Sequence, residues 1–258
     1  HLLPLFASQK QFQLDLLGKE SDFLQMNHPL RTNGTSKRLM QKLEGYRIME
    51  LDSGKSTENE YWDWALSAGH YSFGLANDDL HYPDISHCIA VRCNFLHTPS
   101  ARYDDLRETL RSGEYYAMRV PDYGHGDWDT KYAMNRELPS ILGIGIEDET
   151  IYISLSEPAD SIKVTGQDHA TLALVLNSSE ASYTMSDNDP YARITAYFPD
   201  GEVIYTNPFA RYDAAVADTP YAEPAHQVNV PMTILFNLAV LALCAGVIFV
   251  FYKVVIKW

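Results

Sequence analysis

The sequence has few cysteines: Cys88, Cys93 and Cys244 are its only three. Three residues at these spacings form neither a disulfide framework nor a Cys-x-x-Cys zinc site. Cys88 and Cys93 could form one bridge, but two free thiols on one buried strand are the simpler expectation. Cys244 lies within an apolar run, where a thiol is expected to be inert.

The chain also lacks an excess of basic residues. It has 20 Lys and Arg against 34 Asp and Glu, a formal net charge of -14. This balance argues against a nucleic-acid backbone or an anionic lipid surface as the main partner, and it disfavours an exonuclease or proofreading domain. An acidic excess fits a site that collects metal cations. With 258 residues, 46% of them hydrophobic, the chain can bury a core in one or two domains.

No charged leader or signal peptide precedes the first apolar run, which starts at His1. We therefore expect these residues to be the remainder of a longer protein.

The first part of the chain alternates predicted strands and helices, with Gly45 and Gly69 ending the two helices. This order predicts a parallel α/β arrangement. The predicted strands end near Met26, Leu51 and Ala76, and the predicted helices are 35–44 and 57–68.

The second of these helices carries the clearest local signals. Residues Thr57 to Glu60 fit a capping box. Tyr61, Trp64, Ala65 and Ala68 fall at the spacing of one apolar stripe and are predicted to face the core.

Polar residues follow the strand that ends at Ala76: Asp78, Asp79 and His81. In α/β folds, the C-terminal ends of parallel strands are where ligand-binding loops converge. Asp79 and His81 lie two residues apart, so on an extended segment their side chains point to the same side and could share one metal ion. Carboxylate and imidazole suit zinc, manganese or iron.

One strand or a pair of strands is predicted at 85–96 and another strand at 115–120, joined by a helix that Gly113 ends. Residues 121–139 then form a long insertion, which we expect to be either a lid over the site or a variable surface loop. From Ile141 onward, apolar and polar residues alternate. This pattern predicts antiparallel strands that form a small β-sandwich packed against the α/β part.

The only long apolar run comes near the C-terminus, after a polar tether at 213–230. Met232 to Tyr252 is apolar apart from Thr233 and Asn237, and it is long enough to cross a bilayer core of ~30 Å as a helix. Lys253 and Lys257 flank its far end, which predicts a cytoplasmic C-terminus and an extracytoplasmic folded part.

Several stretches resemble the PHP-domain metal-dependent hydrolases, named for polymerase and histidinol phosphatase. The most specific is WDWALSAGHYSFGLANDDLH, residues 62–81, which resembles the signature carrying the family's last two metal ligands. Similar stretches are NHP at 27–29, YRIMEL at 46–51, DDLRETLRSGEYYA at 104–117 and YARITAYFPDGEVIYTNPF at 191–209.

The resemblance implies an α/β fold: part of a distorted β/α, TIM-like barrel, followed by an antiparallel β-sandwich-like region and one transmembrane helix. It divides the chain into residues 1–120 as the C-terminal portion of the barrel, 121–140 as an insertion loop, 141–212 as a β-rich region, 213–230 as a linker and 231–252 as the transmembrane helix.

The resemblance also implies a metal site with two or three divalent ions (Zn, Mn or Fe) in the complete protein. Its ligands here would be His1, His28, Asp79 and His81. Asp78 would hold the loop in shape, accept a hydrogen bond from a ligand's free nitrogen, or replace Asp79 as ligand. The family's opening H-x-H and its following Asp or His, His and Glu have no counterpart in this chain.

The expected activity is metal-dependent hydrolysis, with a small phosphoester as the substrate and Arg31 as a candidate contact for its anionic group. A surface salt bridge is the other role open to Arg31. One alternative is hydrolysis of carboxyl esters, carbamates or amides by the same fold. Another is a catalytically inactive extracytoplasmic module that binds a ligand through loops such as 121–139. The membrane is the expected partner of the C-terminal helix, no nucleic acid is expected, and the sequence leaves the oligomeric state open.

Overall fold

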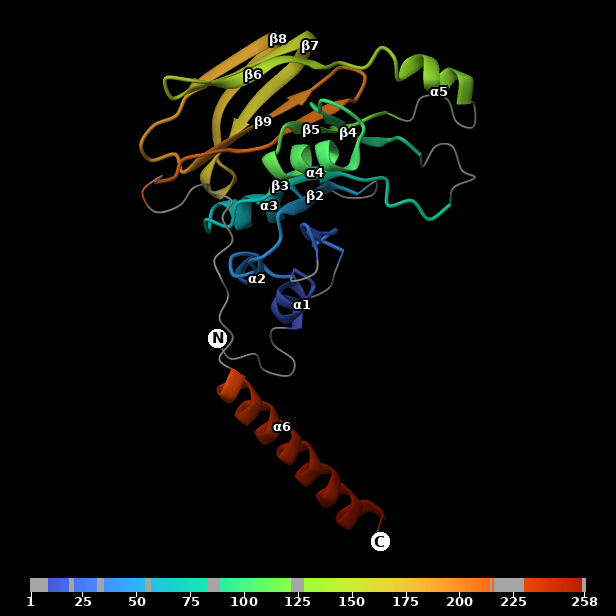
Figure 1. The fold of residues 1–258 in the computed structure, drawn as a ribbon, viewed down its shortest axis with the longest axis vertical. Coiled ribbons are helices and arrows are strands. Elements are labelled where there is room, and N and C mark those ends of the chain that lie inside the picture. Colours follow the sequence, from blue (N-terminus) through green and yellow to red (C-terminus); the bar gives the residue numbers. More distant parts are fainter. Residues whose placement is uncertain are drawn as a thin grey trace.

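The structure is a computed structural model that describes residues 9–18, 21–31, 35–53, 57–82, 89–121, 128–213, 215 and 230–256. Figure 1 shows a small sheet with its helices, a large curled sheet above it and a long C-terminal helix. The helices are α1 (Gln9–Leu17), α2 (Lys37–Met40), α3 (Asn59–Leu66), α4 (Tyr103–Ser112), α5 (Trp128–Met134) and α6 (Val230–Phe251). The strands are β1 (Gln25–Met26), β2 (Ile48–Asp52), β3 (Phe73–Ala76), β4 (Arg92–Leu96), β5 (Tyr115–Arg119), β6 (Ile141–Glu147), β7 (Thr150–Thr165), β8 (Thr171–Thr184), β9 (Tyr191–Tyr197), β10 (Val203–Thr206) and β11 (Phe209–Ala210).

The small sheet has the order β1-β2-β3, and both pairings are parallel. All five residues of the central strand β2 are buried, as expected of a parallel strand covered on both faces. Gly74 on β3 lets Leu51 on β2 pack against the backbone, because a Cβ at residue 74 would lie 2.2 Å from Leu51 Cδ1. The parallel order predicted for the first three strands is therefore present.

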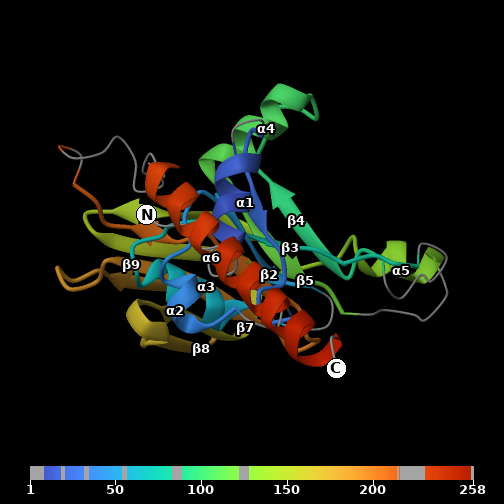
Figure 2. The ribbon, with the colours of Figure 1, turned by 90° about the horizontal axis from the view of Figure 1, so that it is seen from below.

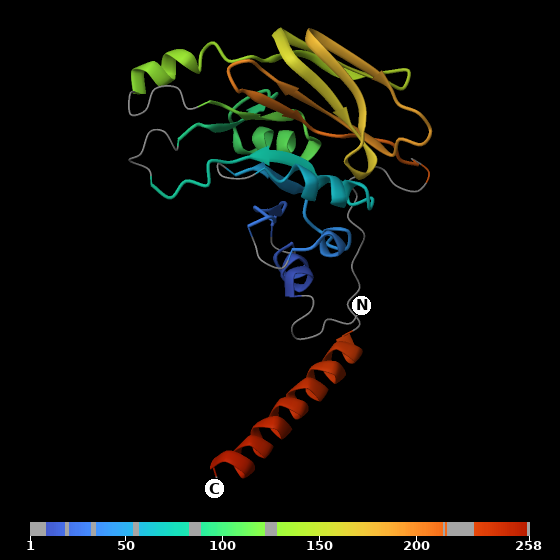
Figure 3. The same cartoon turned by 180° about the vertical axis from the view of Figure 1, so that it is seen from behind.

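Among the described residues, the large sheet has eight strands. Its main order is β4-β5-β10-β9-β7-β6, with β8 paired to β7 and β11 paired to β9. All of these pairings are antiparallel. The strands β7 and β8 are 16 and 14 residues long, and Figure 3 shows them arching over the rest of the sheet. Seen from below, α4 and β4 project on one side, and α5 lies beyond the start of β4, away from its arrowhead (Figure 2).

The predicted fold class is wrong, because the described residues form no β/α barrel. The strands β4 and β5, which were expected in the parallel part, pair antiparallel with each other, and β5 pairs antiparallel with β10. The alternation after Ile141 correctly indicates antiparallel strands, but these share one curled sheet with β4 and β5 and do not form a separate sandwich. The physical reason is that a strand's apolar pattern defines its buried face, while it leaves the direction of its neighbour open. The division of the chain at residues 120, 140, 212 and 230 stays a prediction.

Helix α3 differs from its sequence prediction in start and in buried face. Its N-cap is Glu58, which makes no side-chain cap hydrogen bond, and Thr57 instead pairs with Asp52 in an isolated β-bridge. The buried face of the helix differs from the predicted apolar stripe, because it includes a charged residue, Asp63. The buried residues of the helix are Trp62, Asp63, Ala65 and Leu66. By contrast, Gly113 ends α4 as predicted, with a φ of 81° that suits glycine.

The buried carboxylate of Asp63 joins α3 to the large sheet. Arg193 on β9 donates to it from Nε at 2.8 Å and from Nη2 at 2.6 Å, and Tyr191 donates at 3.3 Å. His169, in the β7–β8 connection, contacts the same carboxylate through Nδ1. Burial favours the neutral acid, but Arg193 and His169 outweigh it and lower the pKa of Asp63 below its ordinary value. The guanidinium of Arg193 also lies 5.2 Å from the ring centroid of Trp62.

Helix α6 and the turn after it form one apolar segment, Val230–Val254. An 18-residue window within it has a mean hydropathy of 2.7, and none of that window is buried against the described part of the chain. By length and composition it is able to cross a membrane. Figure 1 shows it extending away from the two sheets.

Candidate metal and substrate site

The small parallel sheet brings together the described residues that the sequence singled out. His28 and Arg31 follow the C-terminal end of β1, and Asp79 and His81 follow the C-terminal end of β3. The strand between them, β2, contributes Glu50 and ends at Asp52. His1, the remaining predicted ligand, lies outside the described residues.

His28 is held by its backbone while its ring keeps an unused nitrogen. Its backbone N–H donates to Glu50 Oε2 at 2.6 Å. Its φ of 29° lies in the left-handed region, which non-glycine residues seldom adopt and which is found more often at functional sites. The ring Nδ1 is buried and has no hydrogen-bond partner among the described residues. An unpartnered buried nitrogen is costly unless something binds it.

Glu50 ties the loop after β1 to the loop after β3. Its Oε2 accepts the backbone N–H of His28, and its Oε1 accepts Asn77 Nδ2 at 3.1 Å. Burial raises the pKa of Glu50, although these two hydrogen bonds and the nearby His28 act in the opposite direction. The charge of Asp79 raises it further, so Glu50 and Asp79 interact electrostatically.

Asp79 forms an ion pair with Arg31, and both side chains are partly exposed. The hydrogen bond from Arg31, together with its charge, lowers the pKa of Asp79 although partial desolvation opposes the shift. Arg31 also donates from Nη2 to Ser53, to its carbonyl oxygen at 2.5 Å and to its Oγ at 2.6 Å. Like His28, Asp79 has a positive φ, 51°. Arg31 therefore ties the loop after β1 to the residue that follows β2 and to the loop after β3.

His81 is 67% exposed, and its ring is oriented by the backbone. Its Nδ1 lies 2.5 Å from the carbonyl oxygen of Asp79. An Nδ1–H that donates to this carbonyl fixes the tautomer and leaves Nε2 as the nitrogen that can bind a ligand. Metal-binding histidines are commonly oriented by such a bond.

Asp78 holds the loop in shape, the first of the three roles considered for it. Its carboxylate accepts the backbone N–H groups of Ala90, Val91 and Arg92 at 2.7, 3.0 and 2.8 Å. These three bonds attach the loop after β3 to the start of β4. Both oxygens are used in this way, so Asp78 is a poorer candidate than Asp79 for a metal ligand.

We expect Asp78→Ala to lower the free energy of unfolding by about 1–3 kcal/mol, because it leaves partly buried N–H groups without an acceptor. Asp78→Asn keeps one acceptor oxygen and should lose less. Urea unfolding followed by circular dichroism measures both. An Ala variant as stable as the wild type would show that the three bonds do not hold the loop.

A second polar cluster at the end of β2 escaped sequence analysis. Asp52 is fully buried and accepts Arg92 Nε at 2.5 Å, Arg119 Nη2 at 2.6 Å and Arg119 Nε at 2.8 Å. Tyr205 donates to the same carboxylate at 3.3 Å. The available signal was the pair Glu50 and Asp52, two acidic residues in an otherwise apolar strand. Charged residues are seldom fully buried unless they are paired.

The residue types at this edge suit a divalent cation, but their arrangement is incomplete. Among the described residues, no three His, Cys, Asp or Glu side chains are grouped closely enough to hold a metal ion. The unpartnered His28 Nδ1 and the oriented ring of His81 fit a metal site. The carboxylate of Asp79, in contrast, is paired with Arg31.

A cleft of about 670 Å³ lies elsewhere, between β4, β5, β6 and the segment before β11. Its walls are mainly apolar and include the stacked rings of Phe95 and Tyr116, whose centroids are 5.1 Å apart. Its ionisable side chains are those of His97, Glu114 and two tyrosines. We place the candidate chemistry at the edge of the small sheet, because that is where carboxylates, imidazoles and guanidinium groups meet.

Comparison with known protein families gave no match, and no curated protein matches the sequence. Among solved structures, the chain is similar to a two-domain protein from Bacteroides vulgatus ATCC 8482 that contains a predicted PHP-like metal-dependent phosphoesterase. The similarity covers 80% of this chain and 67% of that one, at 16% sequence identity and a TM-score of 0.34. This similarity is too distant to show a shared fold.

Proposed function

We propose that this chain is the metal-binding part of a membrane-tethered hydrolase that acts on phosphoesters. Its motif WDWALSAGHYSFGLANDDLH resembles the PHP signature. The observation that carries the proposal is the buried, unpartnered Nδ1 of His28 at the edge where Asp79 and His81 also lie.

In this proposal His28, Asp79 and His81 are ligands of a divalent ion, with zinc, manganese and iron as the candidates. The ion supplies Lewis acidity to the phosphoryl group and makes water a better nucleophile. Glu50 keeps the loops of His28 and Asn77 together. Arg31 must share Asp79 with the ion or release it, and release would make its Nη1 available for an anionic substrate while Nη2 stays bonded to Ser53.

Metal analysis of the purified full-length protein tests this proposal. We expect at least one tightly bound divalent ion per chain. We expect His28→Ala and His81→Ala each to weaken its binding about tenfold or more, since changes that only disturb ligand orientation already cost 10 to 100-fold. Measurement by mass spectrometry and by titration with zinc or manganese does not depend on knowing the substrate.

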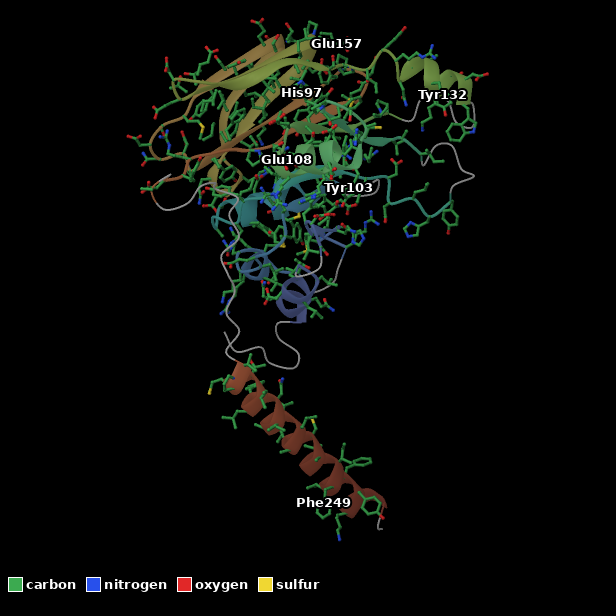
Figure 4. The ribbon with its side chains drawn as sticks, viewed as in Figure 1. His97, Tyr103, Glu108, Tyr132, Glu157 and Phe249 are labelled. Carbon is green, nitrogen blue, oxygen red and sulfur yellow. The ribbon has the colours of Figure 1, made fainter. Side chains whose placement is uncertain are left out.

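The matched control is His97→Ala. His97 is 95% exposed, lines the apolar cleft and is labelled in the upper part of the molecule in Figure 4. This variant should keep its full metal content. A wild-type protein without metal affinity, or a His81→Ala variant with unchanged affinity, would contradict the ligand assignment.

An inactive binding module is the second candidate, and the apolar cleft favours it. Its volume of about 670 Å³ lies in the range of small-molecule sites. This function needs no metal, so a metal-free protein that binds an apolar fluorescent probe in the cleft would support it. Loss of that binding in Tyr116→Ala would place the probe there.

A further inference from the structure

Two arginines lie side by side at the end of the large sheet that meets β2. Arg92 on β4 and Arg119 on β5 are direct cross-strand partners, so both side chains emerge on the same face. Like charges at such positions repel each other. The carboxylate of Asp52 lies between them and accepts hydrogen bonds from both.

This cluster keeps an excess of positive charge and of donors. Two guanidinium groups face one carboxylate, and Asp52 is completely buried while the side chains of Arg92 and Arg119 are 12% and 32% exposed. The Nη1 of Arg92 donates a hydrogen bond to the carbonyl oxygen of Val91. Among the described residues, Arg92 Nη2 and Arg119 Nη1 have no hydrogen-bond acceptor.

Two neighbouring polar groups, those of Asp78 and Tyr205, form their hydrogen bonds elsewhere than with the unused nitrogens of Arg92 and Arg119. The carboxylate of Asp78 is used by backbone N–H groups, including that of Arg92. Lys131 on α5 lies close enough to Cys93 to influence its thiol, but it has an interaction partner of its own, so the excess is that of Arg92 and Arg119. Tyr205 donates its hydroxyl to Asp52.

The cluster adjoins the candidate metal site. Asp52, which holds Arg92 and Arg119, directly precedes Ser53, which holds Arg31. The two residues 78 and 79 likewise connect Arg92, through its backbone, to Arg31. Three guanidinium groups therefore gather around the C-terminal end of β2, in a chain with a net charge of -14.

We propose that Arg92 and Arg119 bind the phosphate group of the substrate. Paired guanidinium groups match the oxygens of phosphate, to which each can donate two parallel hydrogen bonds. Asp52 holds both side chains in place before the anion arrives, so little side-chain freedom is lost on binding. The choice of phosphate over other anions rests on the proposed function, whereas the anion site rests on the two arginines.

Calorimetric titration of the full-length, detergent-solubilised protein with inorganic phosphate tests the proposal. The protein is first treated with EDTA, so that bound metal does not contribute. We expect measurable binding by the wild type, at least about tenfold weaker binding by Arg119→Gln, and an intermediate loss in Arg119→Lys. The control Arg102→Gln, an exposed arginine before α4, should bind phosphate within about twofold of the wild type.

Absence of phosphate binding by the wild type overturns the proposal. So does wild-type affinity in an Arg119→Gln variant whose circular dichroism is unchanged. If the chain binds phosphate but no metal, the arginine site stands and the proposed metallohydrolase is overturned. If it binds metal but no phosphate, the metal site stands and the arginine site is overturned.

A second measurement covers the case in which the Arg119 variants do not fold. Phenylglyoxal modifies accessible arginines, and mass spectrometry gives the rate at each position in the wild type. Phosphate should slow the modification of Arg119 several-fold and leave that of Arg102 unchanged. Equal rates at Arg119 with and without phosphate would overturn the proposal.

Discussion

Asp63→Ala is expected to lower the free energy of unfolding by about 3–5 kcal/mol, because it leaves Arg193 as a buried charge without its partner. Both side chains are almost completely inaccessible, with 0% of Asp63 and 2% of Arg193 exposed. The same change removes the acceptor of His169 and one acceptor of Tyr191. Loss of these contacts should therefore loosen the attachment of α3 to the large sheet and lower the stability of the protein.

Chemical denaturation followed by tryptophan fluorescence measures this effect, since Trp62 lies beside Arg193. Asp160→Ala on β7, an exposed carboxylate, is the control and should change stability by no more than about 0.5 kcal/mol. The double variant Asp63→Leu with Arg193→Met removes both charges and should lose less than Asp63→Ala. If the double variant is as unstable as the single one, the unpaired charge is not the cause.

The pH dependence provides a separate check on the same ion pair. Because the folded-state pKa of Asp63 is lowered, its stabilising contribution is complete above the unfolded-state pKa of about 3.9. It is lost as the pH falls through the lower folded-state value. The stability difference between the wild type and Asp63→Ala should therefore shrink below about pH 4.

Asp63 also shows what the sequence could not disclose. A helix stripe is predicted from apolar residues, and a carboxylate within α3 would be assigned to the exposed face. Its partner Arg193 lies 130 residues further along the chain, and no local pattern connects the two. The same limit applies to Arg92 and Arg119, which become neighbours only through the pairing of β4 with β5.

Features that depend on local chemistry were predicted better. The buried strand that became β2, the helix stop at Gly113 and the parallel order of the first three strands follow from short apolar runs and turn residues. Placement of His28, Asp79 and His81 after strand ends followed from the same reasoning. The direction of β4 and β5 could not be predicted in this way, because a barrel strand and a strand of a curled antiparallel sheet can share one apolar pattern.

Helix α6 supplies the other large expected effect, and we propose that it anchors the protein in a membrane with the folded part outside the cytoplasm. Its segment Val230–Val254 is unburied, so removing it takes no packing from the sheets. Lys253 and Lys257 follow its far end. The Nζ of Lys253 lies 5.5 Å from the ring centroid of Phe249, a residue labelled near the end of α6 in Figure 4. Positive residues favour the cytoplasmic side.

A chain that stops before Val230 should move from the membrane fraction to the soluble fraction almost completely, because the apolar side chains that favour the bilayer are gone. Sedimentation of membranes after an alkaline carbonate wash measures the partition, and an exposed-face variant such as Asp160→Ala in the full chain should stay in the membrane fraction. Protease added outside intact cells should reach the folded part in the full chain. A shortened chain that still sediments with membranes would show that α6 is not the anchor, and protection of the folded part from protease would reverse the orientation.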